Sequence, residues 1–95
     1  MAVFIHVPLP GITTEQYDAL NARLQEMPGI FDGCLSHVCA RVGGGIEIFD
    51  LWESEEHMRA FGERMAPIAV EFGFPVDPSQ PPATQAVHNY WTTGG

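Results

Sequence analysis

Hydrophobic residues follow two spacings along the chain, and these spacings predict six elements in the order strand, helix, strand, strand, helix, strand. Runs rich in β-branched and aromatic residues predict four strands, at Ala2–Val7, Cys34–Val42, Gly45–Trp52 and Gln85–Trp91. Apolar residues three or four positions apart predict two helices. One face of the first helix carries Tyr17, Leu20, Leu24 and Met27, and one face of the second carries Met58, Phe61, Met65, Ile68 and Phe72.

Local signals predict where these helices begin and end. Thr13 and Gln16 have the spacing of a capping box at the start of the first helix, and Pro28 with the following glycine ends it. Ser54 is a natural cap for the second helix. Because proline lacks an amide hydrogen, Pro67 is expected to kink or restart the second helix.

The order of elements is that of the ferredoxin-like βαββαβ fold. We therefore predict a single α+β domain over residues 1–95. Its four-stranded antiparallel sheet is expected to have the strand order 4-1-3-2, with both helices on one face. The segment Phe74–Thr84 holds four prolines and is expected to be an ordered crossing loop.

The sheet face away from the helices is expected to be apolar. Val3, Ile5 and Val7 alternate along the first strand, as Phe49 and Leu51 do along the third, and both alternating sets of each strand are rich in apolar residues. An exposed apolar sheet face is a liability for a monomer. Pairing two sheets face to face would cover it, so we predict a homodimer through this sheet face.

Composition narrows the classes of partner. The chain has 95 residues, of which 45% are hydrophobic, and its formal net charge is -8. A surface of this sign repels nucleic-acid phosphates and anionic lipids, so we expect neither nucleic-acid nor membrane partners. No apolar run approaches the roughly 20 residues that span a bilayer, and the start of the chain has no basic region typical of a secretory signal.

The two cysteines, Cys34 and Cys39, are expected to lie on one strand. Their odd spacing predicts opposite faces of that strand, roughly 16 Å apart at about 3.3 Å per residue, which excludes a disulfide between them. We expect two reduced, buried thiols and a cytoplasmic protein.

The chain resembles the dimeric α+β barrel superfamily, in its antibiotic-biosynthesis-monooxygenase-like branch. The marks of the resemblance are Pro10–Thr13 before the first helix, Pro28 and the glycine after it, Trp52–Glu56 leading to Phe61, and Val87–Asn89 in the last strand. The superfamily includes cofactor-free monooxygenases of polyketide quinols, heme-degrading enzymes, polyketide cyclases and lactone isomerases. The resemblance implies a barrel-like dimer with a pocket between the sheet and the helices.

The chain departs from the better-known branches at particular positions. It is similar to the quinol monooxygenases at Trp52, but their asparagine four residues earlier falls on Ile48. The heme degraders have an asparagine where this chain has His6, a tryptophan where it has Phe61, and their heme-ligand histidine near Val70. Heme is therefore not the expected ligand.

Candidate acid–base groups are His6, His37 and Asp50. We expect His6 and Asp50 to converge at one end of the sheet, with the first and third strands as parallel neighbours. A two-residue turn in the glycine run before the third strand would place His37 opposite Asp50, whereas a three-residue turn would place it opposite Leu51. We prefer the first, because it pairs the carboxylate with an imidazole, an arrangement that suits general acid–base catalysis.

His88, in the last strand, is expected beside the first strand and within reach of His6. Three histidines and one aspartate would be enough to hold a divalent metal, but their spacing matches no metal motif, so no metal site is predicted.

These residues predict a pocket for a small apolar or aromatic ligand. Its expected walls are Phe4, Trp52, Phe61, Met65, His88 and Tyr90. The leading hypothesis is a small enzyme without a tightly bound cofactor that acts on an aromatic or polyketide-like compound, by monooxygenation or by the proton transfer of a cyclase or isomerase. The alternative is a non-catalytic ligand-binding or accessory dimer. A cavity with converging polar groups would favour the enzyme, and a filled core would favour the accessory role.

Overall fold

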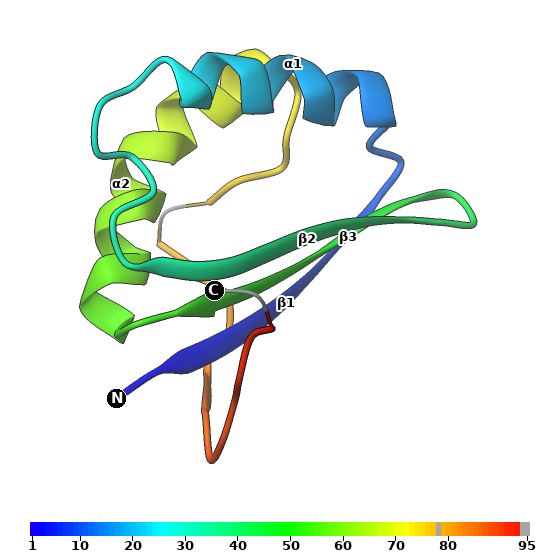
Figure 1. The fold of residues 1–95 in the computed structure, drawn as a ribbon. Helices are drawn as coiled ribbons and strands as arrows, with labels where there is room; N and C mark the ends of the chain where they lie inside the picture. Colours follow the sequence, from blue (N-terminus) through cyan, green and yellow to red (C-terminus); the bar gives the residue numbers. More distant parts are fainter. Residues whose placement is uncertain (78, 94–95) are drawn as a thin grey trace.

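The computed structural model describes residues 1–77 and 79–93, with elements in the expected order. They are β1 (Val3–Pro10), α1 (Thr14–Gln25), β2 (Cys34–Val42), β3 (Gly45–Trp52), α2 (Glu55–Glu71) and β4 (Gln85–Ala86). The strands form one antiparallel sheet in the order β2-β3-β1-β4. Both helices lie on the same side of this sheet (Figure 1). The expected small α+β architecture is confirmed.

Both predicted helix caps are present. The Thr13 hydroxyl accepts a hydrogen bond from the Gln16 amide at 3.0 Å, and the Gln16 side chain accepts one from the Thr13 amide at 2.9 Å. Ser54 caps α2 by accepting from the His57 amide. These bonds satisfy amide groups that have no partner inside the helix. Each helix therefore begins where the chain itself indicates.

Helix α2 continues through Pro67 as one helix, so the predicted restart does not occur. Next to Pro67, Ala66 is buried, and Ala69 is buried one turn further on. Packing of the last turns against the core offsets the hydrogen bond that the proline cannot make.

The β2–β3 hairpin has the predicted two-residue turn at Gly43 and Gly44. Gly44 has a φ of +85°, which suits a residue without a side chain. Val42 pairs with Gly45, and this register places His37 opposite Asp50. The expected His37–Asp50 pairing is confirmed.

A register irregularity lies at the start of β2, between Cys34 and Ser36. Cys34 pairs with Trp52 and Ser36 with Leu51, so the residue between them is an extra residue of the kind found in a β-bulge. The bulge reverses the alternation and brings Cys34 to the helix side of the sheet.

The prediction that Cys34 and Cys39 occupy opposite faces is therefore wrong. Cys39 pairs with Ile48, on the helix side like Cys34, and each packs against an apolar cluster. Their partner positions on β3 are four residues apart, which corresponds to about 13 Å along the strand. Both thiols are free, and distance along the strand is what separates them.

Strands β1 and β3 are antiparallel, which corrects the expectation that they are parallel neighbours. Ile5 pairs with Asp50 and His6 with Phe49. In a split βαβ arrangement β3 lies between β1 and β2 and runs against both. Because paired residues point to the same face, His6 lies on the face opposite to Asp50.

Strands β1 and β4 also differ from prediction in length. β1 continues past the expected Val7 to Pro10, and β4 is two residues long instead of seven. β4 pairs with Val3 and Phe4, so within the described residues the next part of β1 pairs with β3 alone. An open strand side tolerates the missing amide hydrogens of prolines, which is why β1 includes them.

The core lies between the helices and the inner face of the sheet. One cluster of buried residues contains Leu9, Ile12, Leu20, Leu24, Ile30, Ile46, Ala69 and Phe74, and a second contains Val3, Ile5, Trp52 and Met58. The two predicted helix stripes supply much of this packing. Within the described residues, neither helix has the length and apolar composition needed to cross a membrane.

Candidate functional site

A cavity of about 430 Å³ lies between the inner face of the sheet, the two helices and the loop that follows α2. Its walls are mainly apolar and include Ile5, Val7, Leu20, Leu24, Ile48, Trp52, Phe61, Met65, Phe74 and Val76. Exposed polar residues, Arg59, Glu63, Asp77 and Gln80, also border it. The cavity is thus a largely apolar space that reaches solvent at a polar rim.

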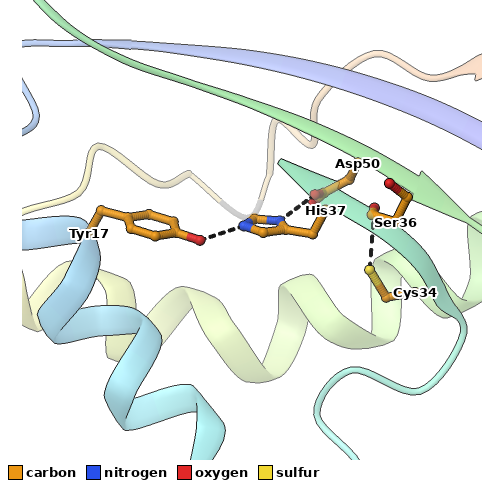
Figure 2. Close-up of polar contacts among 5 residues, drawn as sticks. All are labelled: Tyr17, Cys34, Ser36, His37 and Asp50. Carbon is orange, nitrogen blue, oxygen red and sulfur yellow. Dashed lines mark hydrogen bonds and ion pairs between the residues drawn. The ribbon is translucent and has the colours of Figure 1, made fainter. Parts of the chain in front are cut away.

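Three polar side chains from three elements form a hydrogen-bonded row beside this cavity (Figure 2). The Tyr17 hydroxyl, from α1, lies 2.6 Å from Nε2 of His37. Nδ1 of His37, from β2, lies 2.5 Å from Oδ1 of Asp50 on β3. The ring planes of Tyr17 and His37 are nearly parallel, with an interplanar angle of 7°. The row therefore connects a helix to the centre of the sheet.

One arrangement of protons makes each contact of this row a donor–acceptor pair, with Asp50 as a carboxylate and His37 as a neutral imidazole. An ionised Asp50 only accepts, so Nδ1 of His37 carries the proton and donates it. In the neutral ring Nε2 is then the acceptor, and the Tyr17 hydroxyl donates to it. Burial, followed by the negative charges of Cys39, Asp50 and Asp18, raises the pKa of Tyr17 to about 12. Tyr17 is therefore a protonated donor at neutral pH.

Among the described residues, Asp50 is the one polar or charged residue in the buried class, with 5% of the whole residue exposed. It lies between Phe49 and Leu51 in a central strand, where a carboxylate is costly to bury without a partner. His37 supplies that partner, and its own side chain is 39% exposed. The imidazole thus links a buried carboxylate to the accessible edge of the cavity.

Five of the residues predicted for the site border this cavity. His37 and Asp50 belong to the polar row, and Trp52, Phe61 and Met65 form wall. The ring centroids of Trp52 and Phe61 are 5.1 Å apart. Phe61 also stacks with Phe31, with ring centroids 5.9 Å apart. Three aromatic rings are therefore contiguous along one side of the cavity.

His6 does not point into this cavity, contrary to the prediction. Its Nε2 lies 2.6 Å from Glu47 Oε1 on the outer face of the sheet, and its ring stacks on Phe49 with centroids 4.6 Å apart. The antiparallel pairing of β1 with β3 is the reason, because it places His6 opposite Phe49 and not beside Asp50. Phe4 shares this outer face and is likewise not cavity wall.

His88 and Tyr90 also lie away from the cavity. They follow β4 in an irregular segment that borders a shallow depression on the outer face, next to Phe4 and Phe49. β4 pairs Ala86 with Val3, so continuing that register would carry His88 towards the start of β1, away from His6. The expected approach of His88 to His6 is therefore wrong.

Tyr17 is the residue of the polar row that sequence reasoning missed. Its place in an apolar helix stripe suggested a core residue, and the structure shows it partly buried against the core. A tyrosine in such a stripe differs from leucine or methionine in having a hydroxyl that needs a partner when buried. This need for a hydrogen-bond partner was the signal in the sequence that could have placed Tyr17 in a polar cluster.

Two further polar groups border the cavity. Trp52 is 1% exposed, and its indole Nε1 has no hydrogen-bond partner among the described residues. Asn21 lies on α1 one helical turn after Tyr17 and also lines the cavity. In the part of the chain that the structure describes, no three His, Cys, Asp or Glu side chains are grouped to hold a metal ion.

Comparison with known proteins adds little to this description. No protein-family model matches the chain. No curated protein matches it either. Among solved structures, that of Rv0793 from Mycobacterium tuberculosis is similar to it with a TM-score of 0.43 and 20% sequence identity, over 97% of this chain and 96% of that one. The interpretation of the site therefore rests on its own geometry.

Proposed function

We propose that the protein is an enzyme without a tightly bound cofactor that transfers protons on a small aromatic or polyketide-like molecule. The observation that carries this proposal is the row of Tyr17, His37 and Asp50 along one side of an apolar cavity. A cavity with converging polar groups is the arrangement expected of a small-molecule site.

The row provides a path for a proton. The oxygen of Tyr17 accepts a proton from the substrate while its own proton passes to Nε2 of His37. Asp50 holds the ring in the required tautomer and stabilises the resulting imidazolium, as a carboxylate does for histidine in other general-base sites. The reverse transfer returns a proton to the product. Proton removal of this kind begins cyclisations, isomerisations and cofactor-free oxygenations alike.

The walls of the cavity support an aromatic and uncharged substrate. Phe31, Trp52 and Phe61 present contiguous rings, and offset or edge contacts with a ligand ring are favourable there. The net charge of -8 disfavours anionic ligands. The volume of about 430 Å³ lies within the range of about 300–1,000 Å³ that is common for small-molecule pockets.

One observation favours a second candidate, a non-catalytic ligand-binding protein. Both ring nitrogens of His37 are already occupied, one by Asp50 and the other by Tyr17. If Tyr17 does not pass on its proton, the row serves to fix β2, β3 and α1 around a binding cavity. Measurements of substrate proton exchange distinguish the enzyme from the non-catalytic ligand-binding protein.

The experiment is deuterium incorporation into β-tetralone, an aromatic ketone with acidic α-protons, followed by proton NMR in deuterium oxide. The wild-type protein should accelerate loss of the α-proton signals. Tyr17→Phe and His37→Ala should each slow the catalysed exchange by about a hundredfold or more, which is the usual contribution of a positioned acid or base. His6→Ala is the matched control, because that histidine lies on the outer face.

Equal exchange by wild type and Tyr17→Phe would contradict the proposed proton path. Binding of β-tetralone by the wild type without accelerated exchange would instead support the non-catalytic alternative.

We also propose that the chain is a homodimer of the dimeric α+β barrel type, similar to the antibiotic-biosynthesis-monooxygenase branch, with the outer sheet face at the interface. Val38 is 51% exposed on that face, and Phe4 and Phe49 are incompletely covered. A second copy would bury these side chains, which supports the proposal.

A further inference from the structure

Gly62 is a glycine that the fold of α2 does not require. It lies inside a helix of 17 residues and has no positive φ. Apart from its chain neighbours and the backbone of its own helix, a Cβ built at this position would meet no heavy atom within 4 Å. A glycine inside a helix is destabilising relative to alanine because its backbone loses more freedom on folding. Neither backbone conformation nor packing therefore explains it.

Ala66 and Ala69, on the buried face of α2, are more deeply buried than Gly62. Ala69 is 0% exposed and belongs to the main core cluster, whereas Ala66 is 3% exposed and also borders the cavity. Gly62 is only half-buried and borders the cavity, directly after Phe61 and three residues before Met65. The space that a side chain would occupy at position 62 is therefore open, not filled by protein.

We propose that Gly62 determines substrate size, by leaving room at the α2 wall for the edge of a fused-ring ligand. This inference rests on the proposed function and names its substrate class as fused aromatic compounds in preference to single rings. The Phe31, Phe61 and Trp52 rings provide the stacking surface, and the missing side chain at Gly62 extends the space beside them. A ligand that used this space would contact the helix backbone itself.

The test compares Gly62→Ala and Gly62→Leu with a control on the same helix. Ala60 is exposed and does not border the cavity, so Ala60→Leu adds a similar side chain outside the site. Binding is measured by the fluorescence of N-phenylnaphthylamine, a neutral fused-ring probe, and folding by thermal melting. Gly62→Ala should melt at a higher temperature than wild type and yet bind the probe several times more weakly.

Gly62→Leu should weaken probe binding by about tenfold or more, since about 1.4 kcal/mol corresponds to each factor of ten. Ala60→Leu should bind as the wild type does. In the exchange assay, Gly62→Leu should lower kcat/KM for β-tetralone more than for acetophenone, which has a single ring. The ratio of kcat/KM for β-tetralone to kcat/KM for acetophenone reports size selection. A general loss of stability would not change this ratio.

Wild-type affinity for the probe in a folded Gly62→Leu protein would overturn the inference, as would an equal loss in Ala60→Leu. These results leave the proton path intact, because they concern ligand size alone. Probe binding without any exchange would overturn the enzymatic proposal but still test Gly62 through affinity. If the wild type neither binds the probe nor catalyses exchange, both proposals are wrong.

Discussion

His37 and Asp50 face each other across the β2–β3 hairpin, with Nδ1 of the imidazole 2.5 Å from Oδ1 of a carboxylate whose side chain is 7% exposed. A second pair of the same kind lies on the other side of the sheet, where His6 is 2.6 Å from Glu47 and that side chain is 29% exposed. The two pairs have similar contact distances, made through different ring nitrogens, and differ in the burial of the carboxylate. Their comparison separates the energetic effect of burial from that of the contact.

Replacing His37 by alanine should lower the free energy of unfolding by about 1–3 kcal/mol, because the substitution leaves a buried Asp50 carboxylate without its partner. His6→Ala should have the smaller effect, because the Glu47 side chain is 29% exposed within the chain, against 7% for Asp50. Urea unfolding at neutral pH measures both. Equal effects of the two substitutions would show that the burial of Asp50 has no energetic consequence.

Tyr17 should make the protein less stable at high pH. Its pKa is raised from 10.0 to about 12, mainly by burial. Below the unfolded value both states keep the proton. As the pH rises from about 10 towards 12, the unfolded chain loses it first, so unfolding becomes more favourable. Wild-type stability should fall more steeply than that of Tyr17→Phe in this window.

Absorbance of the phenolate provides a direct measurement. The difference between the titrations of wild type and Tyr17→Phe isolates this one hydroxyl. Its midpoint should lie near 12 in the folded protein. A midpoint near 10 would mean that the Tyr17 hydroxyl is not held in a buried hydrogen bond.

Cys34 and Cys39 should both be reduced thiols that react slowly in the folded protein. Burial raises the pKa of each, so little of the reactive thiolate forms at neutral pH. Titration with a thiol reagent after unfolding without reductant should find both groups, and the same reagent should react more slowly before unfolding. An intrachain bridge, detected by mass, would contradict the positions of the two residues on β2.

The proposed dimer should depend on the outer face of β2. Val38→Asp places a charge where a second copy would cover an apolar surface, so it should shift sedimentation from dimer to monomer at micromolar concentration. Val70→Asp is the control, because Val70 is comparably exposed but lies on α2. A stable, folded wild-type monomer at the same concentration would contradict the dimer.

Hemin should not bind at a defined site. The resemblance to the heme degraders would place their ligand histidine near Val70 and their tryptophan at Phe61, and Val70 is 57% exposed on α2. Titration should show no saturable Soret band of low-micromolar affinity, whereas a globin apoprotein measured in parallel should show one. A Soret band that saturates at one hemin per chain would refute this prediction.

Several features of the fold were predictable because residues a few positions apart decide them. The Thr13 cap and its partner Gln16 lie within one helical turn, so their hydrogen bonds form wherever that helix forms. The glycine turn before β3 sets the hairpin register, and the register in turn brings His37 opposite Asp50. That part of the candidate site follows from local geometry.

Other parts of the site depend on contacts between distant segments. Tyr17 meets His37 only because α1 packs over β2, 20 residues away along the chain. The direction of β1 against β3 decides that His6 faces outward, and the bulge at Cys34 reverses a face that simple alternation predicts. The length of β4 depends on how many of its residues pair with β1. The amino-acid sequence by itself thus determined the elements, their caps and the hairpin pair, since these need only near neighbours. The tertiary structure decided which faces those residues share, because strand pairing and helix docking are settled by packing across the whole domain.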